Sequence, residues 1–179
     1  MKTIVINLFG EPSVGKSTAA MDITAKLKRA GINAEYVSEF AKDKVYEHND
    51  EVFAHQEYLF GKQSFKMGRV NGQVQVIVTD SPLLFNVLYN NDNEILGEDF
   101  NKAVIRMFNS YDNRNYVLTR YHKYENEGRL QNEEEATEVR CELLDLLHSL
   151  NIQYECCTSS EEDCMKIVNK IAQEAKRYE

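Results

Sequence analysis

Residues 10–17, with the sequence GEPSVGKS, constrain the fold of this chain more than any other segment. An apolar run at 3–9 precedes them, and the sequence TAAMDI follows them. This order predicts a strand, a glycine-bounded loop and a helix start, the context in which G-x-x-x-x-G-K-S forms a phosphate-binding loop. The glycines allow the backbone N–H groups to point inward, and the helix N-terminus adds partial positive charge. The segment therefore predicts binding of a nucleoside triphosphate, with an ordinary strand-to-helix turn as the alternative.

The residues of this loop have expected roles in holding a nucleotide. Lys16 would reach the outer phosphates, and the Ser17 hydroxyl would ligate Mg²⁺. The other residues expected to contact the nucleotide are Gly10, Pro12, Ser13, Val14, Gly15 and Thr18. ATP and Mg²⁺ are therefore the expected cofactors.

The composition is that of an ordinary globular protein. The chain has 179 residues, of which 42% are hydrophobic and 28% charged, and this length and mixture suit one domain. No apolar run approaches a membrane span, and the first residues do not resemble a secretory signal. We therefore expect a cytoplasmic protein without a membrane partner. The formal net charge of −8 argues against a broad nucleic-acid-binding face.

The cysteines do not have the spacing of a metal site. They are Cys141, Cys156, Cys157 and Cys164, and none forms a C-x-x-C pair, so a zinc site is not expected. Because they lie on apolar helix stripes or at the end of an apolar run, we expect buried free thiols.

Hydrophobic periodicity predicts alternating helices and strands along the whole chain. Besides 3–9, the expected strands cover 33–38, 73–79, 115–119 and 152–156. The expected helices cover 18–30, 51–70, 83–89, 100–108 and 132–150, and a last helix begins at Ser159 or Ser160 and runs to Ala175. The strand–helix–strand order implies a parallel sheet. The sequence thus predicts one five-stranded α/β domain.

Two acids follow predicted strands directly. Glu39 follows the second strand and Asp80 ends the third, and ligands of open α/β sheets bind beyond the carboxyl ends of the strands. We expect Glu39 to face the substrate as a general base, with a helix cap or a solvated acid as the alternative. Asp80 is the expected Mg²⁺-side acid, acting directly or through water, with a turn residue before Ser-Pro as the alternative. Which of the two takes the proton stays open.

The polar, aromatic-rich segment 121–131 has no periodicity, and a loop of this length is usually functional. We expect it to form a lid that closes over the phosphates and excludes water. Arg120, before it, and Arg129, within it, are candidate cations for the γ-phosphoryl group, with surface ion pairs as the alternative. Tyr124 in the same segment is a candidate substrate contact.

Further candidate substrate contacts are Gln56, Gln63 and Ser81. The two glutamines interrupt the apolar face of the helix predicted at 51–70, and an inward amide needs a partner. That partner is either the edge of a ligand base or a backbone group. Ser81 follows Asp80 at the end of the third strand.

These residues lie in segments that resemble P-loop nucleoside and nucleotide kinases, and the likeness is greatest to small NadR-type (ribosylnicotinamide kinase-like) and bacteriophage-encoded P-loop kinase or ATPase proteins. The segments are GEPSVGKST, SEFAKD, TDSPLL and RYHKYENEGRLQ. The resemblance implies a three-layer P-loop NTPase fold with strand order 2-3-1-4-5. It also implies that Glu39 is the general base, that Asp80 serves Mg²⁺ or substrate, and that Arg129 stabilises the transferred group.

The sequence does not name the phosphoryl acceptor. Ser81 follows Asp80, so the Glu-Arg-Ser pattern of deoxynucleoside kinases and the Asp-Arg pair of thymidylate kinases are both absent. The first hypothesis is a kinase acting on a hydroxyl or phosphate of a nucleoside- or nucleotide-like small molecule. The alternatives are a kinase acting on DNA, such as hydroxymethylated pyrimidines, and a non-kinase ATPase switch. The oligomeric state is open, with a homodimer as one option.

Overall fold

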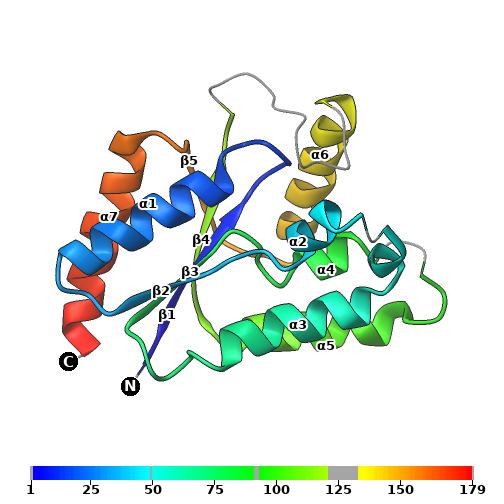
Figure 1. Ribbon diagram of the computed structural model, residues 1–179, viewed down its shortest axis with the longest axis horizontal. Helices are drawn as coiled ribbons and strands as arrows, with labels where there is room; N and C mark the ends of the chain where they lie inside the picture. Colours follow the sequence, from blue (N-terminus) through cyan, green and yellow to red (C-terminus); the bar gives the residue numbers. More distant parts are fainter. Residues whose placement is uncertain (1, 49, 91–92, 121–132, 179) are drawn as a thin grey trace.

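Five parallel strands form one sheet at the centre of the molecule (Figure 1). A computed structural model describes residues 2–48, 50–90, 93–120 and 133–178. The strands are β1 (Ile4–Phe9), β2 (Ala34–Val37), β3 (Val76–Thr79), β4 (Asp112–Leu118) and β5 (Glu155–Cys157). Their order is β2-β3-β1-β4-β5, and each neighbouring pair is parallel. The predicted α/β fold and strand order are confirmed.

Helices cover both faces of this sheet and make three layers (Figure 1). One face is covered by α1 (Lys16–Arg29) and α7 (Glu161–Ala175). The other is covered by α3 (Gln56–Gly68), α4 (Phe85–Leu88), α5 (Gly97–Asn109) and α6 (Glu133–Ser149). The remaining helical segments are α2 (Ala41–Tyr46) and the short 3₁₀ helices η1 (Asp50–Ala54) and η2 (Lys176–Tyr178). Within the described ranges, no helix combines the length and hydropathy needed to cross a membrane.

The central strand β1 is buried along its whole length because both faces carry helices. Ile4, Ile6 and Leu8 belong to the core beneath α1 and α7. Val5 and Phe9 belong to the opposite core. This alternation fixes the register of β1, since a shift by one residue would exchange its two faces.

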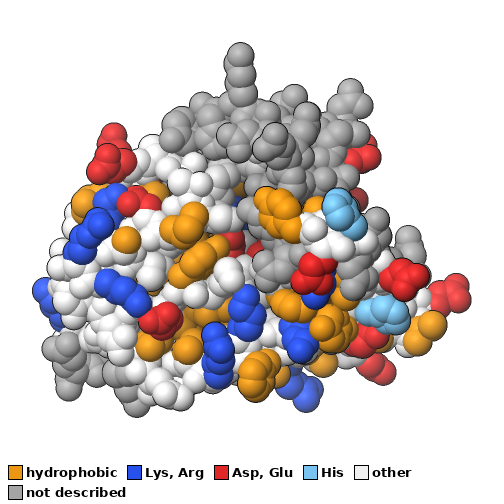
Figure 2. Space-filling model, viewed as in Figure 1, with side chains coloured by type: hydrophobic (Ala, Val, Ile, Leu, Met, Phe, Trp, Pro, Cys, Tyr) orange, Lys and Arg blue, Asp and Glu red, His pale blue; other side chains and the backbone are white. Residues whose placement is uncertain are grey.

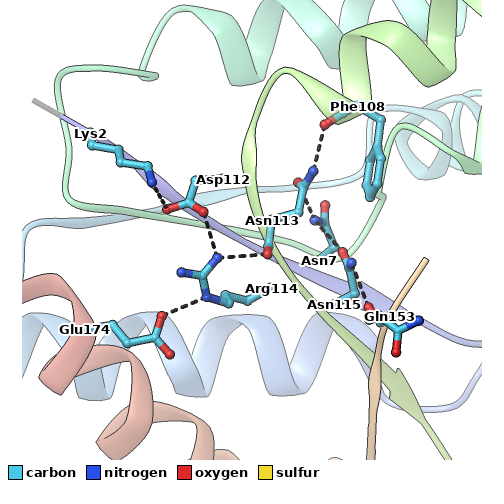
Figure 3. Close-up of polar contacts among 9 residues, drawn as sticks. All are labelled: Lys2, Asn7, Phe108, Asp112, Asn113, Arg114, Asn115, Gln153 and Glu174. Atoms are coloured by element: carbon cyan, nitrogen blue, oxygen red, sulfur yellow. Dashed lines mark hydrogen bonds and ion pairs between the residues drawn. The ribbon is translucent and has the colours of Figure 1, made fainter. Parts of the chain in front are cut away.

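A polar network explains why β4 begins at Asp112 and not at residue 115 as predicted. The Asn7 side chain on β1 donates to Asn113 Oδ1 at 2.8 Å and to Asn115 Oδ1 at 3.0 Å (Figure 3). Arg114, in turn, donates to Glu174 of α7 at 2.7 Å. These contacts give partners to the Asn7 amide nitrogen and to the polar side chains at 113–115, so a segment without apolar alternation still forms a strand.

Other predicted boundaries are also corrected. The helix expected at 51–70 is divided into η1 and α3, because His55 leaves the helical conformation with φ −109° and ψ 70°. The strand expected at 152–156 is shorter at its start and covers Glu155–Cys157 as β5. Ile152 is not part of the strand, because its N–H donates to the Leu147 carbonyl oxygen and so completes the end of α6.

The prediction of four buried thiols is wrong for two cysteines. Cys164 is buried and Cys157 is partly buried, whereas Cys141 and Cys156 are exposed. Cys141 lies on the outward side of α6, and Cys156 lies on the edge strand β5.

Ser160, rather than Ser159, caps α7. Its hydroxyl accepts a hydrogen bond from the Asp163 N–H at 3.3 Å. Replacing Ser160 with alanine is expected to lower the free energy of unfolding by about 1 kcal/mol, because an N–H of the first turn loses its acceptor. Ser159→Ala is the matched control, since that hydroxyl makes only a 3.4 Å contact to the Val14 carbonyl oxygen. Denaturant unfolding of both variants checks this, and equal losses would contradict the assignment of the cap.

Candidate functional site

The loop between β1 and α1 is tightly curled. Gly10, Ser13 and Gly15 have φ values of 144°, 63° and 93°. A Cβ added at Gly10 would lie 2.8 Å from Val14 Cγ1 and 3.2 Å from the Leu118 carbonyl oxygen. Only glycine fits this position, because both the backbone conformation and the space exclude a side chain. Gly15 is the N-cap of α1, and it has no side chain that would occupy the region in front of the helix N-terminus.

Lys16 begins α1 and turns back across the loop. Its ammonium group donates to the carbonyl oxygens of Gly10 at 2.8 Å and Glu11 at 2.9 Å. The same group lies 5.5 Å from the ring centre of Phe85. The positive charge is therefore held within the curl of the loop, where an anion would be attracted to it.

Asp80 connects the ends of β2 and β3. The residue is 2% exposed. Its Oδ2 accepts a hydrogen bond from the Tyr36 hydroxyl at 2.7 Å, and its Oδ1 accepts one from the Glu39 backbone N–H at 3.0 Å. The parallel strands β1 and β3 pair up to Asn7↔Thr79, so Asp80 and the loop that follows β1 lie at the same edge of the sheet. Asp80 thus fixes the backbone of Glu39 at this edge.

Tyr36 joins Ser17 to this pair. Burial raises the pKa of the Tyr36 phenol far above its usual value, and the negative charge of Asp80 raises it further, whereas a hydrogen bond with the Ser17 side chain acts in the opposite direction. The phenol therefore stays protonated and donates to Asp80. Ser17, Tyr36, Asp80 and Glu39 form one connected group beside the loop.

Glu11, inside the loop, pairs with two arginines. The residue is 4% exposed. Its Oε2 lies 3.0 Å from Arg140 Nη1 on α6, and its Oε1 lies 3.6 Å from Arg120 Nη2 at the end of β4. Arg140 also donates to the carbonyl oxygen of Leu118 at 3.0 Å. Two cations are thus placed against the phosphate loop.

The predicted substrate contacts occupy different positions. Gln63 is 3% exposed and donates to Thr79 Oγ1 at 3.3 Å, while its Oε1 has no hydrogen-bond partner among the residues that the structure describes. The Ser81 N–H donates to the same Thr79 oxygen at 3.1 Å. Gln56 instead donates to the Phe53 carbonyl oxygen at 3.0 Å. Gln63 and Ser81 therefore meet at the end of β3, whereas Gln56 is held by the backbone.

Phe40, the residue after Glu39, forms an aromatic pair with Tyr58 of α3. The rings of Phe40 and Tyr58 meet edge to face, with centroids 5.6 Å apart. Lys44 lies over the Phe40 ring and Lys62 over the Tyr58 ring, each at 5.3 Å. Figure 2 shows Lys or Arg side chains mixed with hydrophobic ones on the face of the molecule that carries α3. The neighbourhood of Glu39 thus combines apolar surface with positive charge.

Comparison with known proteins places this fold in a family. A family model described as an AAA domain matches residues 5–163. The chain belongs to this P-loop family. A search among curated proteins finds no match to this AAA-domain protein.

Solved structures share the fold of this AAA-domain protein. NadR protein in complex with NR has a TM-score of 0.66 and 13% sequence identity, over 96% of this chain and 50% of that chain. NadR in complex with NAD and AMP-PNP has a TM-score of 0.65 and 12% identity, over 97% of this chain and 50% of that chain. Deoxyadenosine kinase from M. mycoides, with the products dCMP and a flexible dCDP, has a TM-score of 0.62 and 18% identity, over 94% and 99%.

The chain spans half the length of the NadR chains. At these identities the matches show the three-layer fold of P-loop kinases, and they give no support to the bacteriophage part of the resemblance.

Several residues of the site were not predicted from the sequence. Tyr36, Glu11 and Arg140 are all absent from the expected set. An acid in a phosphate loop is the one signal that was available, because a carboxylate beside phosphates needs a cationic partner. Arg129, Tyr124 and the predicted lid at 121–131 lie outside the described residues.

Proposed function

We propose that this protein transfers the γ-phosphoryl group of ATP to a hydroxyl or phosphate of a nucleoside- or nucleotide-like small molecule. The supporting observation is that the Asp80–Glu39 contact of 3.0 Å lies at the same sheet edge as the loop 10–17. A phosphate loop alone would suit any P-loop NTPase. An acid fixed beside it, at the end of the neighbouring strand, adds the acceptor side that a kinase needs.

The residues present fit ATP and Mg²⁺. A Cβ at Gly10 would meet Val14 and the Leu118 carbonyl oxygen, so glycine at this position lets the loop curl tightly enough to form a cradle. The amides of residues 10–17 with Lys16 would hold the phosphates. The Ser17 hydroxyl and the Asp80 carboxylate are the oxygen donors that Mg²⁺ prefers. When bound, Mg²⁺ neutralises charge on the phosphate oxygens.

The hydrogen bonds of Asp80 and Glu39 support different roles for the two acids. Both carboxylate oxygens of Asp80 already accept from protein donors, Tyr36 and the Glu39 N–H. This holds Asp80 in one orientation on the Ser17 side, where it would act on Mg²⁺ through water. The Glu39 side chain, which is only partly buried, takes the proton from an acceptor hydroxyl. Arg120 supplies positive charge near the γ-phosphoryl group, and Arg129 remains a predicted contributor.

The acceptor class is supported by the structural neighbours. The NadR structures contain NR in one case and NAD with AMP-PNP in the other, and the deoxyadenosine kinase contains dCMP and dCDP. Gln63 Oε1, which has no partner within the described part of the chain, would accept a hydrogen bond from a base or amide donor. The Phe40–Tyr58 pair offers an aromatic surface beside Glu39.

An acceptor screen with labelled ATP tests this function. The panel contains nucleosides, nucleotides, nicotinamide riboside and modified DNA. We expect ADP formation to rise sharply with a small-molecule acceptor and the label to appear on that molecule. Label on DNA would favour the DNA kinase instead. Fast hydrolysis that no acceptor stimulates would favour an ATPase switch and overturn the proposal.

Replacing Asp80 with asparagine is expected to raise the Mg²⁺ concentration for half-maximal activity by about tenfold, as for other groups that orient a metal through a hydrogen bond. The reason is that a neutral amide attracts Mg²⁺ and its waters less than a carboxylate does. Activity measured against Mg²⁺ concentration checks this. Asp99→Asn on α5, whose side chain is 95% exposed, is the control. An unchanged Mg²⁺ requirement would separate Asp80 from the metal.

A further inference from the structure

We infer that Glu11 is a positioning residue that holds Arg120 and Arg140 against the γ-phosphoryl end of the bound nucleotide. The inference rests on the proposed phosphotransferase function and adds to it a role for an acid within the phosphate loop. It also adds Arg140 of α6 to the cations that face the nucleotide.

The geometry assigns one carboxylate oxygen to each arginine. Arg140 lies 3.0 Å from Oε2 and Arg120 lies 3.6 Å from Oε1. The two side chains come from different parts of the fold, since Arg120 follows the end of β4 by two residues and Arg140 lies within α6. Glu11 therefore forms ion pairs that connect the loop to α6 and to the segment that follows β4.

A second contact fixes this junction to the loop. The Leu118 carbonyl oxygen accepts from Arg140 at 3.0 Å, and it lies 3.2 Å from the position of a Cβ at Gly10. The backbone of β4 thus contacts the first glycine of the loop and one of the two guanidinium groups. A shift of the arginine pair would therefore move the backbone of the phosphate loop.

The negative charge of Glu11 argues against a purely structural role for this residue. A carboxylate beside a phosphate site repels the phosphates, and its burial is costly unless it is paired. Together with Arg120 and Arg140 it leaves an excess of positive charge. Without the carboxylate, the two guanidinium groups would repel each other and lose their common orientation. The acid therefore serves to aim two cations in advance of the reaction.

The test compares Glu11→Gln with the wild type in two measurements. Arginines aimed at the γ-phosphoryl group favour ATP over ADP, so we expect the ratio of the ADP and ATP dissociation constants to fall by about threefold or more. The affinity for ADP, which lacks this group, should be retained. With an acceptor from the screen, kcat should fall about tenfold while the KM for the acceptor stays the same.

Further variants separate positioning from folding. Glu11→Asp keeps the charge and should recover part of the kcat. Arg140→Gln should resemble Glu11→Gln, and the double variant should lose little more, because both changes break the Glu11–Arg140 ion pair. Arg106→Gln, at an exposed position of α5, is the control that removes an arginine elsewhere. Thermal unfolding of each variant verifies that it is folded.

An unchanged ADP-to-ATP ratio in folded Glu11→Gln protein would overturn the inference. Equal weakening of ADP and ATP binding would also overturn it, because Glu11 would then only maintain the loop. The nucleotide affinities need no acceptor, so they test Glu11 even if the screen rejects the proposed phosphotransferase activity.

Discussion

Replacing Lys16 with alanine will slow phosphoryl transfer by about a thousandfold, while the protein remains folded. The ammonium group lies within the curl of the phosphate loop, 2.8 Å from the Gly10 carbonyl oxygen and 2.9 Å from that of Glu11. In the reaction it would turn to the outer phosphates and balance the charge that the transferred group carries, a term whose removal typically costs two to three orders of magnitude or more. Initial rates with the acceptor found in the screen measure the loss.

Stability should change little in this variant. Alanine favours helix, so α1 can still begin at residue 16, and each lost hydrogen bond contributes about 1 kcal/mol. Lys102→Ala on α5 is the control, because Lys102 makes only a surface ion pair with Asp99. A folded Lys16→Ala protein that works at the wild-type rate would remove the loop from the reaction.

Replacing Glu39 with glutamine will lower phosphorylation of a hydroxyl acceptor by about a hundredfold or more, because the amide cannot take the proton. The affinity for ATP should not change, since the Glu39 contact with Asp80 comes from its backbone N–H, which the substitution keeps. Initial rates and ATP titrations measure the two effects separately. Glu35→Gln is the matched control: it removes an acid of β2 whose side chain forms an exposed ion pair with Lys28.

The comparison with Asp80→Asn decides which acid does what. We expect Glu39→Gln to lose turnover at every Mg²⁺ concentration, and Asp80→Asn to recover much of its activity at high Mg²⁺. The opposite pattern would exchange the two roles. This experiment addresses the question that the sequence leaves open, because both acids follow predicted strands in the same way.

The fold and the phosphate loop were predictable because their signals are local. The glycine and lysine spacing at 10–17 needs only eight neighbouring positions, and the periodicity of α7 identifies its buried side in advance. The ends of parallel strands share one edge of the sheet, which placed Glu39 and Asp80 correctly at the same edge.

The partners within the site were not predictable because they are far apart in the chain. Arg140 and Glu11 are separated by 129 positions, and Tyr36 and Asp80 by 44. No periodic pattern links such pairs, and many arginines could have met an acid in the loop. The start of β4 was missed for a related reason, since its asparagine and arginine side chains become compatible with a strand only when Asn7 and Glu174 are in place.

The exposed thiol of Cys141 follows Arg140 directly on α6. Burial raises the pKa of Cys157 to about 12 and that of Cys164 to about 11, so both will react slowly with alkylating reagents at neutral pH. With the exposed Cys156 changed to serine, a single fluorophore can therefore be attached beside the arginine that contacts the phosphate loop. The fluorescence of a label on Cys141 can therefore be used to follow nucleotide binding.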